Sequence, residues 1–496
     1  MTSDPRLSIG PQLANAGAGR VTEALDQLRP ILRVGTGLHP AAAAAVGALY
    51  SMLVRVHPHA ILDGDAAMGL NPWGTSTLAD MPTRLATCRP APTASPARDL
   101  VIAAGTDARD ATLWLGGDDW TALTGPEPVP IVANEHGFGI HAAAALVAAE
   151  VMKGILGPLG MSNVPMNGPL AWNLLDYRLA PTGAVAPPAG RELEVVLFGS
   201  GSVGSSAAGL LACDPRTTGT AILVDPDSFD PSHNPYRYPA STGAERGPKV
   251  DWVAKLLKAA GWSVSGYCGR VADWTREEPT PGWTGIAVSS VDRVDGRLDV
   301  ADVLARTTLS VGVAGLALHA QIEHCFDEFA CPYCDFAGEA APMTLIQARA
   351  QQVGLSPARV AQLDLGGAVL GPDDIATAVA SGRIRPEQAD ELVGRRLDDL
   401  VRRAYAEATI TVSGDERAFV SAPYVSWMGG VLVAAELAKV ARGLPLLDRR
   451  VDLDLSGVPL GVQSRRPRNR AGTCVCSSPK RQAWVSRLYG QDGRDQ

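Results

Sequence analysis

Hydrophobic positions in the second half of the chain form short apolar runs that alternate with helical patterns. Leu193–Phe198 (LEVVLF) and Ala221–Val224 have the length of buried strands, and Val203–Ala212 between them has the composition of a helix. This order is a βαβ unit, whose two strands are parallel. Gly285–Val291 and Thr308–Val313 predict further strands. We therefore predict an α/β fold with a doubly wound, Rossmann-like parallel sheet.

One pattern occurs twice. Leu146–Lys153 (LVAAEVMK) recurs as Leu432–Lys439 (LVAAELAK), and Gly157 and Gly443 follow at the same spacing. Both segments predict alanine-rich helices that end at a glycine cap. Chance similarity is one explanation. We favour a duplication, in which the N-terminal half is a degenerate copy and the chain is a pseudo-dimer. Leu100–Ala104, followed by GTDARD, predicts a strand and a glycine loop that has lost its other glycines.

Changes in composition suggest the domain boundaries. The segment 179–190 is rich in Pro and Gly, which interrupt regular structure. Residues 339–412 show apolar positions at helical spacing and lack cysteine, which indicates a mainly helical insertion or crossover. We divide the chain into a degenerate N-terminal domain (1–180), a linker (181–190), the first part of the second domain (191–338), the insertion (339–412), the completing part of the second domain (413–480) and a tail (481–496).

Composition and charge exclude some classes of protein. The 496 residues include 44 Lys and Arg against 52 Asp and Glu, a net charge of −8, which argues against a general nucleic-acid binder. The apolar runs Ala41–Val54 and Ala142–Ala149 are shorter than the ~18 residues of a membrane-spanning helix. The first residues lack the apolar segment of a secretory signal. We expect a cytoplasmic protein with neither a membrane nor a nucleic acid as partner.

A glycine-rich loop follows the first of these strands. Gly199, Gly201 and Gly204 lie between a strand and a helix, where backbone N–H groups bind phosphate. Asp225 ends the next strand, where a carboxylate can accept hydrogen bonds from ribose hydroxyls. These residues alone are also compatible with two other interpretations, a tight turn that binds no ligand and a site for a nicotinamide dinucleotide.

Polar residues after the second strand favour a triphosphate. Asn234, Arg237 and Lys249 supply an amide and two cations, which suit the charge of a triphosphate better than a pyrophosphate bridge. Asp292 ends another strand and is a candidate Mg²⁺ ligand. Any one of these residues alone is more often a solvated surface group. Their joint order is what supports a site.

Two close cysteine pairs suggest a metal. Cys331 and Cys334 are spaced C-x-x-C, whereas Cys474 and Cys476 are spaced C-x-C. Four thiolates without a redox requirement point to structural Zn²⁺ in tetrahedral coordination. Unligated thiols are the alternative.

From Glu192 to Pro332, and in parts up to residue 480, the chain resembles the adenylating domain of ThiF/MoeB-type proteins and ubiquitin-activating enzymes. The resemblance rests on the glycine loop, Asp225-Pro-Asp227, Asn234-x-x-Arg237, Gly247-x-Lys249, Asp292 and the two cysteine pairs, in that order. It departs at Pro235 and Tyr238, where leucine and glutamine are usual, and in the second and fourth loop positions, which are both serine.

The resemblance implies attack of a carboxylate on the α-phosphate of ATP, which gives an acyl-adenylate and pyrophosphate. Residue roles follow by position. The three loop glycines would hold ATP, Asp225 would bind its ribose, and Asp227 would support the loop. The phosphates would be bound by Asn234, Arg237 and Lys249. Asp292 would bind the Mg²⁺ ion and help to align the incoming carboxylate. Arg237, Lys249 and Asp292 are the expected catalytic residues.

These observations predict an ATP-dependent adenylyltransferase that uses Mg²⁺ and contains Zn²⁺. Its partner would be a ubiquitin-like or sulfur-carrier protein, or a precursor peptide, activated at its C-terminal carboxylate. No cysteine lies between Cys334 and Cys474, where thioester-forming family members carry one, so we expect no enzyme thioester. Members of the family act as dimers, and here the N-terminal half would take the place of the second copy. Arg6 or Arg20 is our guess for an arginine that this half donates to the triphosphate. A homodimer of the whole chain is the alternative assembly. The alternatives are an NAD-dependent oxidoreductase and a catalytically silent scaffold.

Overall fold

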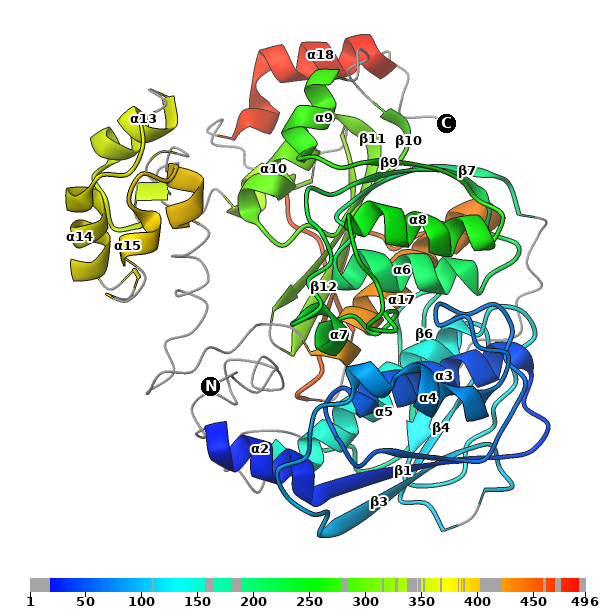
Figure 1. Ribbon diagram of the computed structural model, residues 1–496. Coiled ribbons are helices and arrows are strands. Elements are labelled where there is room, and N and C mark those ends of the chain that lie inside the picture. The colour runs from blue at the N-terminus through cyan, green and yellow to red at the C-terminus, as the bar shows by residue number, and fades with distance from the viewer. Residues whose placement is uncertain are drawn as a thin grey trace.

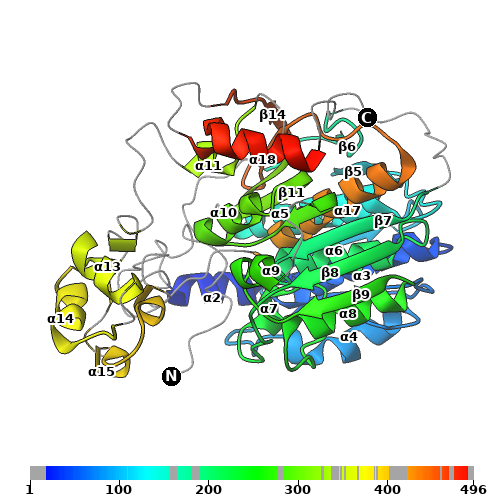
Figure 2. The same ribbon diagram turned by 90° about the horizontal axis from the view of Figure 1, so that it is seen from above.

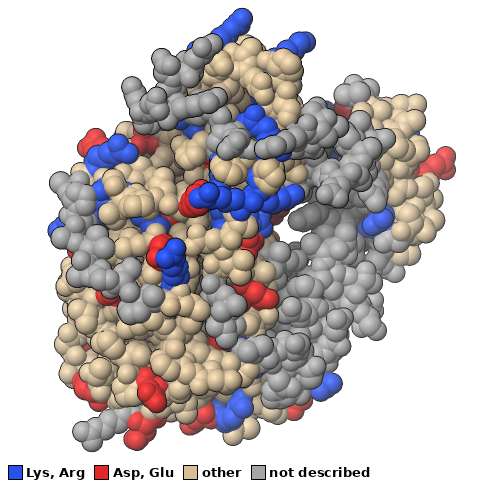
Figure 3. All heavy atoms as spheres, turned by 180° about the vertical axis from the view of Figure 1, so that it is seen from behind, with Lys and Arg blue, Asp and Glu red and all other residues tan. Residues whose placement is uncertain are grey.

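Two α/β halves and a helical insertion make up the described part of this computed structural model (Figure 1). The structure describes residues 18–108, 110–156, 165–179, 190–277, 283–314, 316–325, 329–336, 346, 349–350, 353–365, 368–381, 383–384, 386, 389–401, 422–457, 461–468 and 474–489. In Figure 1 the N-terminal half lies below the C-terminal half. Figure 3 shows the opposite face, where Lys and Arg side chains gather mainly over the middle and top of the molecule.

The N-terminal half contains a mixed sheet in the order β2-β1-β3-β4-β5-β6. Strands β2, β1, β3 and β4 are parallel, and β5 and β6 are antiparallel to their neighbours. Its elements are α2 (Ala18–Gln27), β1 (Leu28–Val34), α3 (Pro40–Val54), β2 (Ile61–Asp63), α4 (Met81–Arg84), β3 (Arg98–Ala104), β4 (Leu113–Gly117), β5 (Thr121–Gly125), α5 (Phe138–Leu156) and β6 (Leu170–Asn173).

The C-terminal half contains a sheet in the order β14-β13-β12-β11-β10-β7-β8-β9. Strands β11, β10, β7, β8 and β9 are parallel, and β12, β13 and β14 are antiparallel to their neighbours. Its elements are β7 (Leu193–Phe198), α6 (Ser202–Ala212), β8 (Gly219–Val224), α7 (Asn234–Arg237), α8 (Lys249–Ala259), β9 (Ser263–Tyr267), α9 (Val271–Glu277), β10 (Trp283–Ser289), α10 (Val294–Asp302), β11 (Ala305–Ala314), β12 (Ala317–His324), α11 (Pro332–Phe336), α17 (Pro423–Arg442), β13 (Arg450–Asp454), β14 (Val462–Ser464), the 3-10 turn η5 (Val475–Ser477) and α18 (Pro479–Tyr489).

The two sheets share one topology. Strands β2-β1-β3-β4-β5-β6 match β8-β7-β10-β11-β12-β13 in order and in relative direction. This confirms the predicted Rossmann-like α/β class and the second copy. The position predicted for the degenerate loop is wrong, because β3, which contains Leu100–Ala104, matches β10 and not β7. The loop that matches Gly199 follows β1 at Gly35. A strand followed by glycine occurs at several strand ends, so the local pattern did not distinguish them.

Helices α3, α5, α6 and α17 form the layer between the two sheets (Figure 1). Helix α5 extends beyond the apolar run Ala142–Ala149 that was noted in the sequence, and α17 has a similar length to α5. Both are long and apolar enough to cross a membrane by length and composition, yet 89% and 94% of the respective segments are buried inside the fold. Helices that are apolar on all sides are expected at the centre of a large core. Helix α17 ends at Gly443 with φ +64°, the predicted left-handed cap, whereas Gly157 lies outside the described residues.

The repeated glutamate and lysine of α5 and α17 form matching contacts between the halves. The ion pairs are Glu150–Lys153, at 2.5 Å, and Glu436–Lys439, at 2.6 Å. Lys153 Nζ also donates to the carbonyl oxygen of Gly457 in the C-terminal half, at 2.7 Å. Lys439 Nζ donates to the carbonyl oxygen of Leu175 in the N-terminal half, at 3.1 Å. The same charged pair therefore ties each half to the other, as a pseudo-two-fold relation requires.

The predicted insertion contains α13 (Pro357–Leu365), α14 (Pro372–Ala380) and α15 (Ala389–Leu392). These helices share a small core of their own, which includes Val360, Ile375 and Leu400. Figures 1 and 2 both show the insertion beside the two halves rather than between them. Residues 402–421 lie outside the described residues, and so do residues 181–189 of the predicted linker 181–190.

The residues predicted as a tail begin inside helix α18. This helix is attached to the C-terminal half, since Tyr489 Oη donates to the carbonyl oxygen of Leu304 at 2.5 Å and Arg481 pairs with Asp302 at 2.6 Å. The segment from 481 to 489 is therefore part of the fold.

Candidate functional site

The glycine loop connects β7 to α6 in a conformation that needs glycine at positions 199 and 204. Gly199 has φ +93°, and its N–H donates to Val224 of the neighbouring strand at 2.9 Å. A Cβ on Gly204 would lie 2.0 Å from the carbonyl oxygen of Gly199, so the first turn of α6 can approach the loop only with glycine there. Gly201 precedes α6 without a side-chain cap, and a Cβ on it would meet nothing closer than 3.8 Å. The N-terminus of α6 is thus open to an anion.

Ser200 and Asp225 join the loop to the end of β8. Asp225 Oδ2 accepts from the N–H of Ser200 at 2.6 Å, and Oδ1 accepts from the N–H of Asp227 at 2.8 Å. Burial raises the pKa of Asp225, although the charge of Lys249 opposes this. The Ser200 hydroxyl is buried and has no hydrogen-bond partner among the described residues. It is one of several buried side-chain groups without a partner in the described part of the chain.

Lys249 brings a buried cation to this edge of the sheet. Its side chain is 10% exposed, and Nζ lies 2.8 Å from Asp227 Oδ2. Burial alone would lower the pKa of Lys249, but Tyr238, Asp225 and Asp227 outweigh it, so the pKa is raised and the charge is retained. Tyr238 stacks on Trp252, with ring centroids 6.1 Å apart, and this stack supports the lysine. Asp227 therefore orients Lys249, whereas the resemblance had implied support of the loop.

Helix α7 carries Asn234 and Arg237 against the start of α6. Ser202 Oγ donates to the carbonyl oxygen of Arg237 at 2.7 Å, which fixes α7 beside the glycine loop. Asn234 is buried and its Oδ1 accepts from the N–H of Asp230 at 2.7 Å, so it also shapes its own loop. The N-terminal half supports this segment, because Trp73 Nε1 donates to the carbonyl oxygen of Pro239 at 2.9 Å.

Asp292 stands exposed just after β10. Ser290, two residues earlier, donates through Oγ to the carbonyl oxygen of Gly199 at 2.7 Å and through its N–H to Phe198 at 2.9 Å. The loop that carries Asp292 is thus bonded directly to the glycine loop. The sequence analysis did not single out Ser290, because a lone serine at the end of a strand is not part of a recognisable motif.

The structure gathers most of the predicted residues at one edge. Strands β8, β7 and β10 are neighbours and run parallel. Asp225 follows β8, the loop glycines follow β7, and Asp292 follows β10. Helix α7 adds Arg237 and helix α8 adds Lys249. Ligands of open α/β sheets bind at this carboxyl edge. Arg20 is exposed on α2, and no contact with another described residue places it at this edge; Arg6 lies outside the described residues. The arginine donor stays a prediction.

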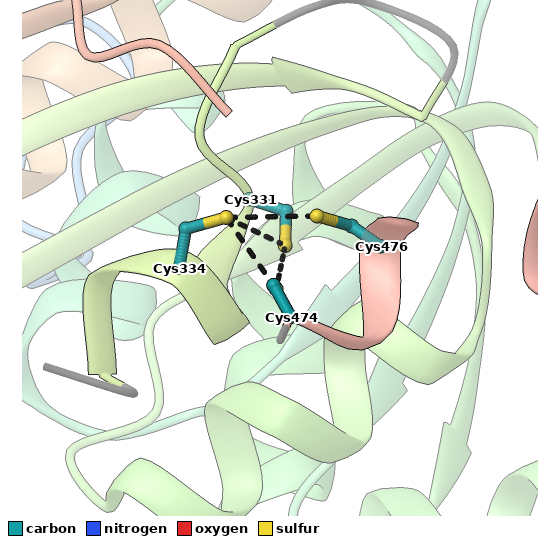
Figure 4. A group of neighbouring side chains, drawn as sticks. All are labelled: Cys331, Cys334, Cys474 and Cys476. Carbon is teal, nitrogen blue, oxygen red and sulfur yellow. Dashed lines mark hydrogen bonds between the residues drawn. The ribbon is translucent and has the colours of Figure 1, made fainter. Parts of the chain in front are cut away.

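The four paired cysteines converge on one point. Their sulfur atoms all lie within 4.8 Å of one another, with Cys331–Cys474 at 3.7 Å and Cys334–Cys476 at 3.5 Å (Figure 4). A tetrahedral Zn²⁺ site with bonds of about 2.3 Å places its sulfur atoms about 3.8 Å apart, so the cluster fits this ion. Burial raises the pKa of Cys474 to about 12, which means that binding must displace protons.

Similarities to known proteins are distant. No family model matches the chain. An uncharacterized protein, y4jF, of Sinorhizobium fredii is 25% identical over 408 residues, which span 77% of this chain and 75% of that protein. Crystal structures of E. coli MccB are similar at 13% identity and a TM-score of 0.33, over 58% of this chain and 65% of the MccB chain. A structure of MccB with ATP matches at 12% identity over 57% of this chain and 67% of that one, also with a TM-score of 0.33.

The corresponding loop of the N-terminal half is filled by a side chain of the protein. Asp107 Oδ2 accepts from the N–H of Thr36 at 2.8 Å and from its hydroxyl at 2.7 Å. These hydrogen bonds hold the pKa of Asp107 below its ordinary value. A Cβ on Gly35 would lie 2.1 Å from Asp107 Oδ1. A carboxylate therefore contacts this loop at Thr36, the position that matches Ser200, whose N–H is bound by the carboxylate of Asp225 in the C-terminal half.

We predict that the purified chain contains one zinc ion held by the cysteine cluster. Replacing Cys474→Ser removes one of four thiolates, and because the cluster joins segments far apart in sequence, its loss should cost on the order of several kcal/mol of stability. Metal analysis and thermal unfolding measure both effects. Cys268→Ser, at an exposed thiol, is the matched control and should retain the metal. Equal zinc content in the two variants would contradict the assignment.

Proposed function

We propose that this protein adenylates a carboxylate at the end of a protein or peptide, using ATP at the carboxyl edge of the C-terminal sheet. The observation that carries the proposal is the convergence of an open, uncapped glycine loop with the buried cation of Lys249 and the exposed carboxylate of Asp292. An anion-binding helix start, a retained positive charge and a hard oxygen ligand are what a nucleoside triphosphate with Mg²⁺ requires.

The reaction would proceed by displacement at the α-phosphorus. A carboxylate oxygen of the acceptor forms a bond to the α-phosphorus, the bond from that phosphorus to the bridging oxygen breaks, and pyrophosphate leaves with the electron pair. Lys249 and Arg237 would neutralise charge on the phosphates. Asp292 would hold Mg²⁺, which supplies further charge neutralisation when bound.

An enzyme thioester forms no part of the proposed mechanism. Burial raises the pKa of both Cys213 and Cys325 to about 12, so these sulfurs stay protonated thiols at neutral pH. Cys88 is buried as well. The activated acceptor would instead pass to an external nucleophile. Four clustered cysteines that suit a metal ion rather than disulfides favour a reducing compartment and hence a cytoplasmic site of action.

The N-terminal half would bind no nucleotide, because the helix after its loop, α3, is capped by its own His39, whose Nδ1 accepts from the N–H of Ala41 at 3.3 Å. It would serve as the inactive partner of a pseudo-dimer that buttresses α7 through Trp73. One ATP per chain is the stoichiometry that follows.

Calorimetric titration with ATP and with NAD, together with ATP–pyrophosphate exchange, tests the proposal. We expect one ATP site per chain, no NAD binding, and exchange that depends on an acceptor carboxylate. A ubiquitin-like protein and a precursor peptide, sought among the products of neighbouring genes, are the two kinds of acceptor to test. Binding of NAD in place of ATP would support an oxidoreductase, and binding of neither would support a silent scaffold.

A further inference from the structure

The segment between α7 and α8 is held by side chains of the N-terminal half. Helix α7 ends at Arg237 and α8 begins at Lys249, so this segment connects the two cations of the proposed site. Residues 238–243 are all buried, and buried carbonyl groups require hydrogen-bond donors. Three of these carbonyl groups accept from N-terminal side chains, namely those of Pro239, Ser241 and Thr242.

Arg55 lies at the centre of this contact. It follows α3 directly, it is 0% exposed, and its Nη2 donates to the carbonyl oxygen of Ser241. Its Nη1 donates to the carbonyl oxygen of Ser51 at 2.6 Å and to the Ser51 hydroxyl at 2.5 Å. That hydroxyl donates in turn to the carbonyl oxygen of Pro239 at 2.6 Å. Arg55 therefore reaches two carbonyl groups of the segment, one directly and one through Ser51.

The hydrogen-bond partners of the Arg55 guanidinium are neutral. They are two carbonyl groups, a hydroxyl and the thiol of Cys88, whose pKa is raised by burial. The charge of Glu245 acts on Arg55, but the Glu245 carboxylate accepts from the Ser241 hydroxyl at 2.5 Å and from the N–H of Thr242 at 2.8 Å. A buried guanidinium bound by neutral groups contributes little to stability, whereas its donors have fixed directions. Its effect is to fix the segment.

The segment connects this contact to Lys249. Pro239 follows Tyr238, whose ring centroid lies 5.8 Å from Nζ of Lys249. The fit against the N-terminal half is close, because Gly243 has φ +81° and a Cβ on it would lie 2.4 Å from Oγ1 of Thr87. A shift of the segment would therefore move the ring against which the lysine lies.

We infer that Arg55 is a positioning residue for ATP. By holding residues 239–242 from the N-terminal half, it fixes Tyr238 and Lys249 in the arrangement that binds the phosphates. This inference rests on the proposed function. Arg55 itself would not touch the nucleotide, and its effect would pass through the backbone of the segment.

Two variants of different severity test this role by calorimetric titration of the full chain with ATP. Arg55→Met fills similar space without donors and should raise the Kd for ATP about tenfold. Ser51→Ala removes only the hydroxyl between Arg55 and Pro239 and should raise the Kd about threefold. The number of ATP sites per chain should stay at one in both. A loss of fold would lower that number, whereas a displaced segment raises the Kd of the folded chain.

Arg89→Met is the matched control. Arg89 also donates to backbone carbonyl groups and to a hydroxyl, but these belong to Pro58, Ala60 and Tyr50 within the N-terminal half. Its loss should leave the Kd for ATP within about twofold of the parent. If Arg55→Met does not fold, Ser51→Ala decides the matter alone.

A parent-like Kd in a folded Arg55→Met or Ser51→Ala chain would overturn the inference and leave the proposed function intact. Equal weakening by Arg89→Met would overturn it as well, because the effect would then be a general one. Failure of the proposed function is seen separately, in a parent chain that does not bind ATP, and it would remove the role of Arg55 with it.

Discussion

Lys249→Met should reduce ATP–pyrophosphate exchange by about 10²–10³-fold. The lysine charge is buried and held against Asp227, so in the proposed site it would already be in place before ATP binds. Methionine has a similar length and fills the same space, which leaves the stack of Tyr238 on Trp252 in place. The loss should fall mainly on exchange at saturating ATP, because under the proposed mechanism the ammonium would stabilise the charge that develops on the leaving pyrophosphate.

Lys258→Met is the matched control for this experiment. Lys258 is exposed in the last turn of the same helix, and its loss should leave exchange within about twofold of the parent. Thermal unfolding of both variants separates a lost charge from a lost fold. Exchange at the parent rate in a folded Lys249→Met protein would remove Lys249 from the proposed site.

Lys439→Met should destabilise the chain by about 3–5 kcal/mol, the cost of leaving one member of a buried ion pair without its partner. Glu436 is 1% exposed and also accepts from Tyr177 Oη at 2.5 Å and from the N–H of Leu447 at 2.9 Å. Without Lys439 its charge would stay buried at the contact between the two halves. Chemical denaturation followed by tryptophan fluorescence measures the change, because Trp73 and Trp427 stack at this contact with centroids 6.1 Å apart.

Because the two halves are related by a pseudo-two-fold axis, the same change in stability is expected at the matching lysine of the other half. Lys153→Met removes the matching contact to Gly457 and should cost a similar amount, whereas the double change Glu436→Gln with Lys439→Met should recover part of the loss. Arg276→Gln breaks an exposed pair with Asp273 and should change stability by less than about 1 kcal/mol. An unfolding midpoint for Lys439→Met equal to that of Arg276→Gln would show that the buried pair does not hold the halves together.

Much of the C-terminal half could be predicted from local sequence. The apolar run that forms β7, the glycine loop and the start of α6 are encoded within a few neighbouring residues, so their order along the chain was sufficient. The cysteine pairs were likewise visible as short spacings, and the repeated LVAAE segment indicated the second copy. Each of these features depends on contacts within one element or between adjacent elements.

Tertiary structure decided what depends on residues far apart in the chain. It placed the matching loop of the N-terminal half at Gly35, and it put the carboxylate of Asp107 into that loop. It also joined Asp227 to Lys249, and it set Arg55 against the carbonyl group of Ser241. Hydrophobic periodicity specifies which face of an element is buried, but it does not specify which distant side chain meets that face. Local sequence therefore determined the elements and their chemistry, and packing of the two halves determined which of those residues share a site.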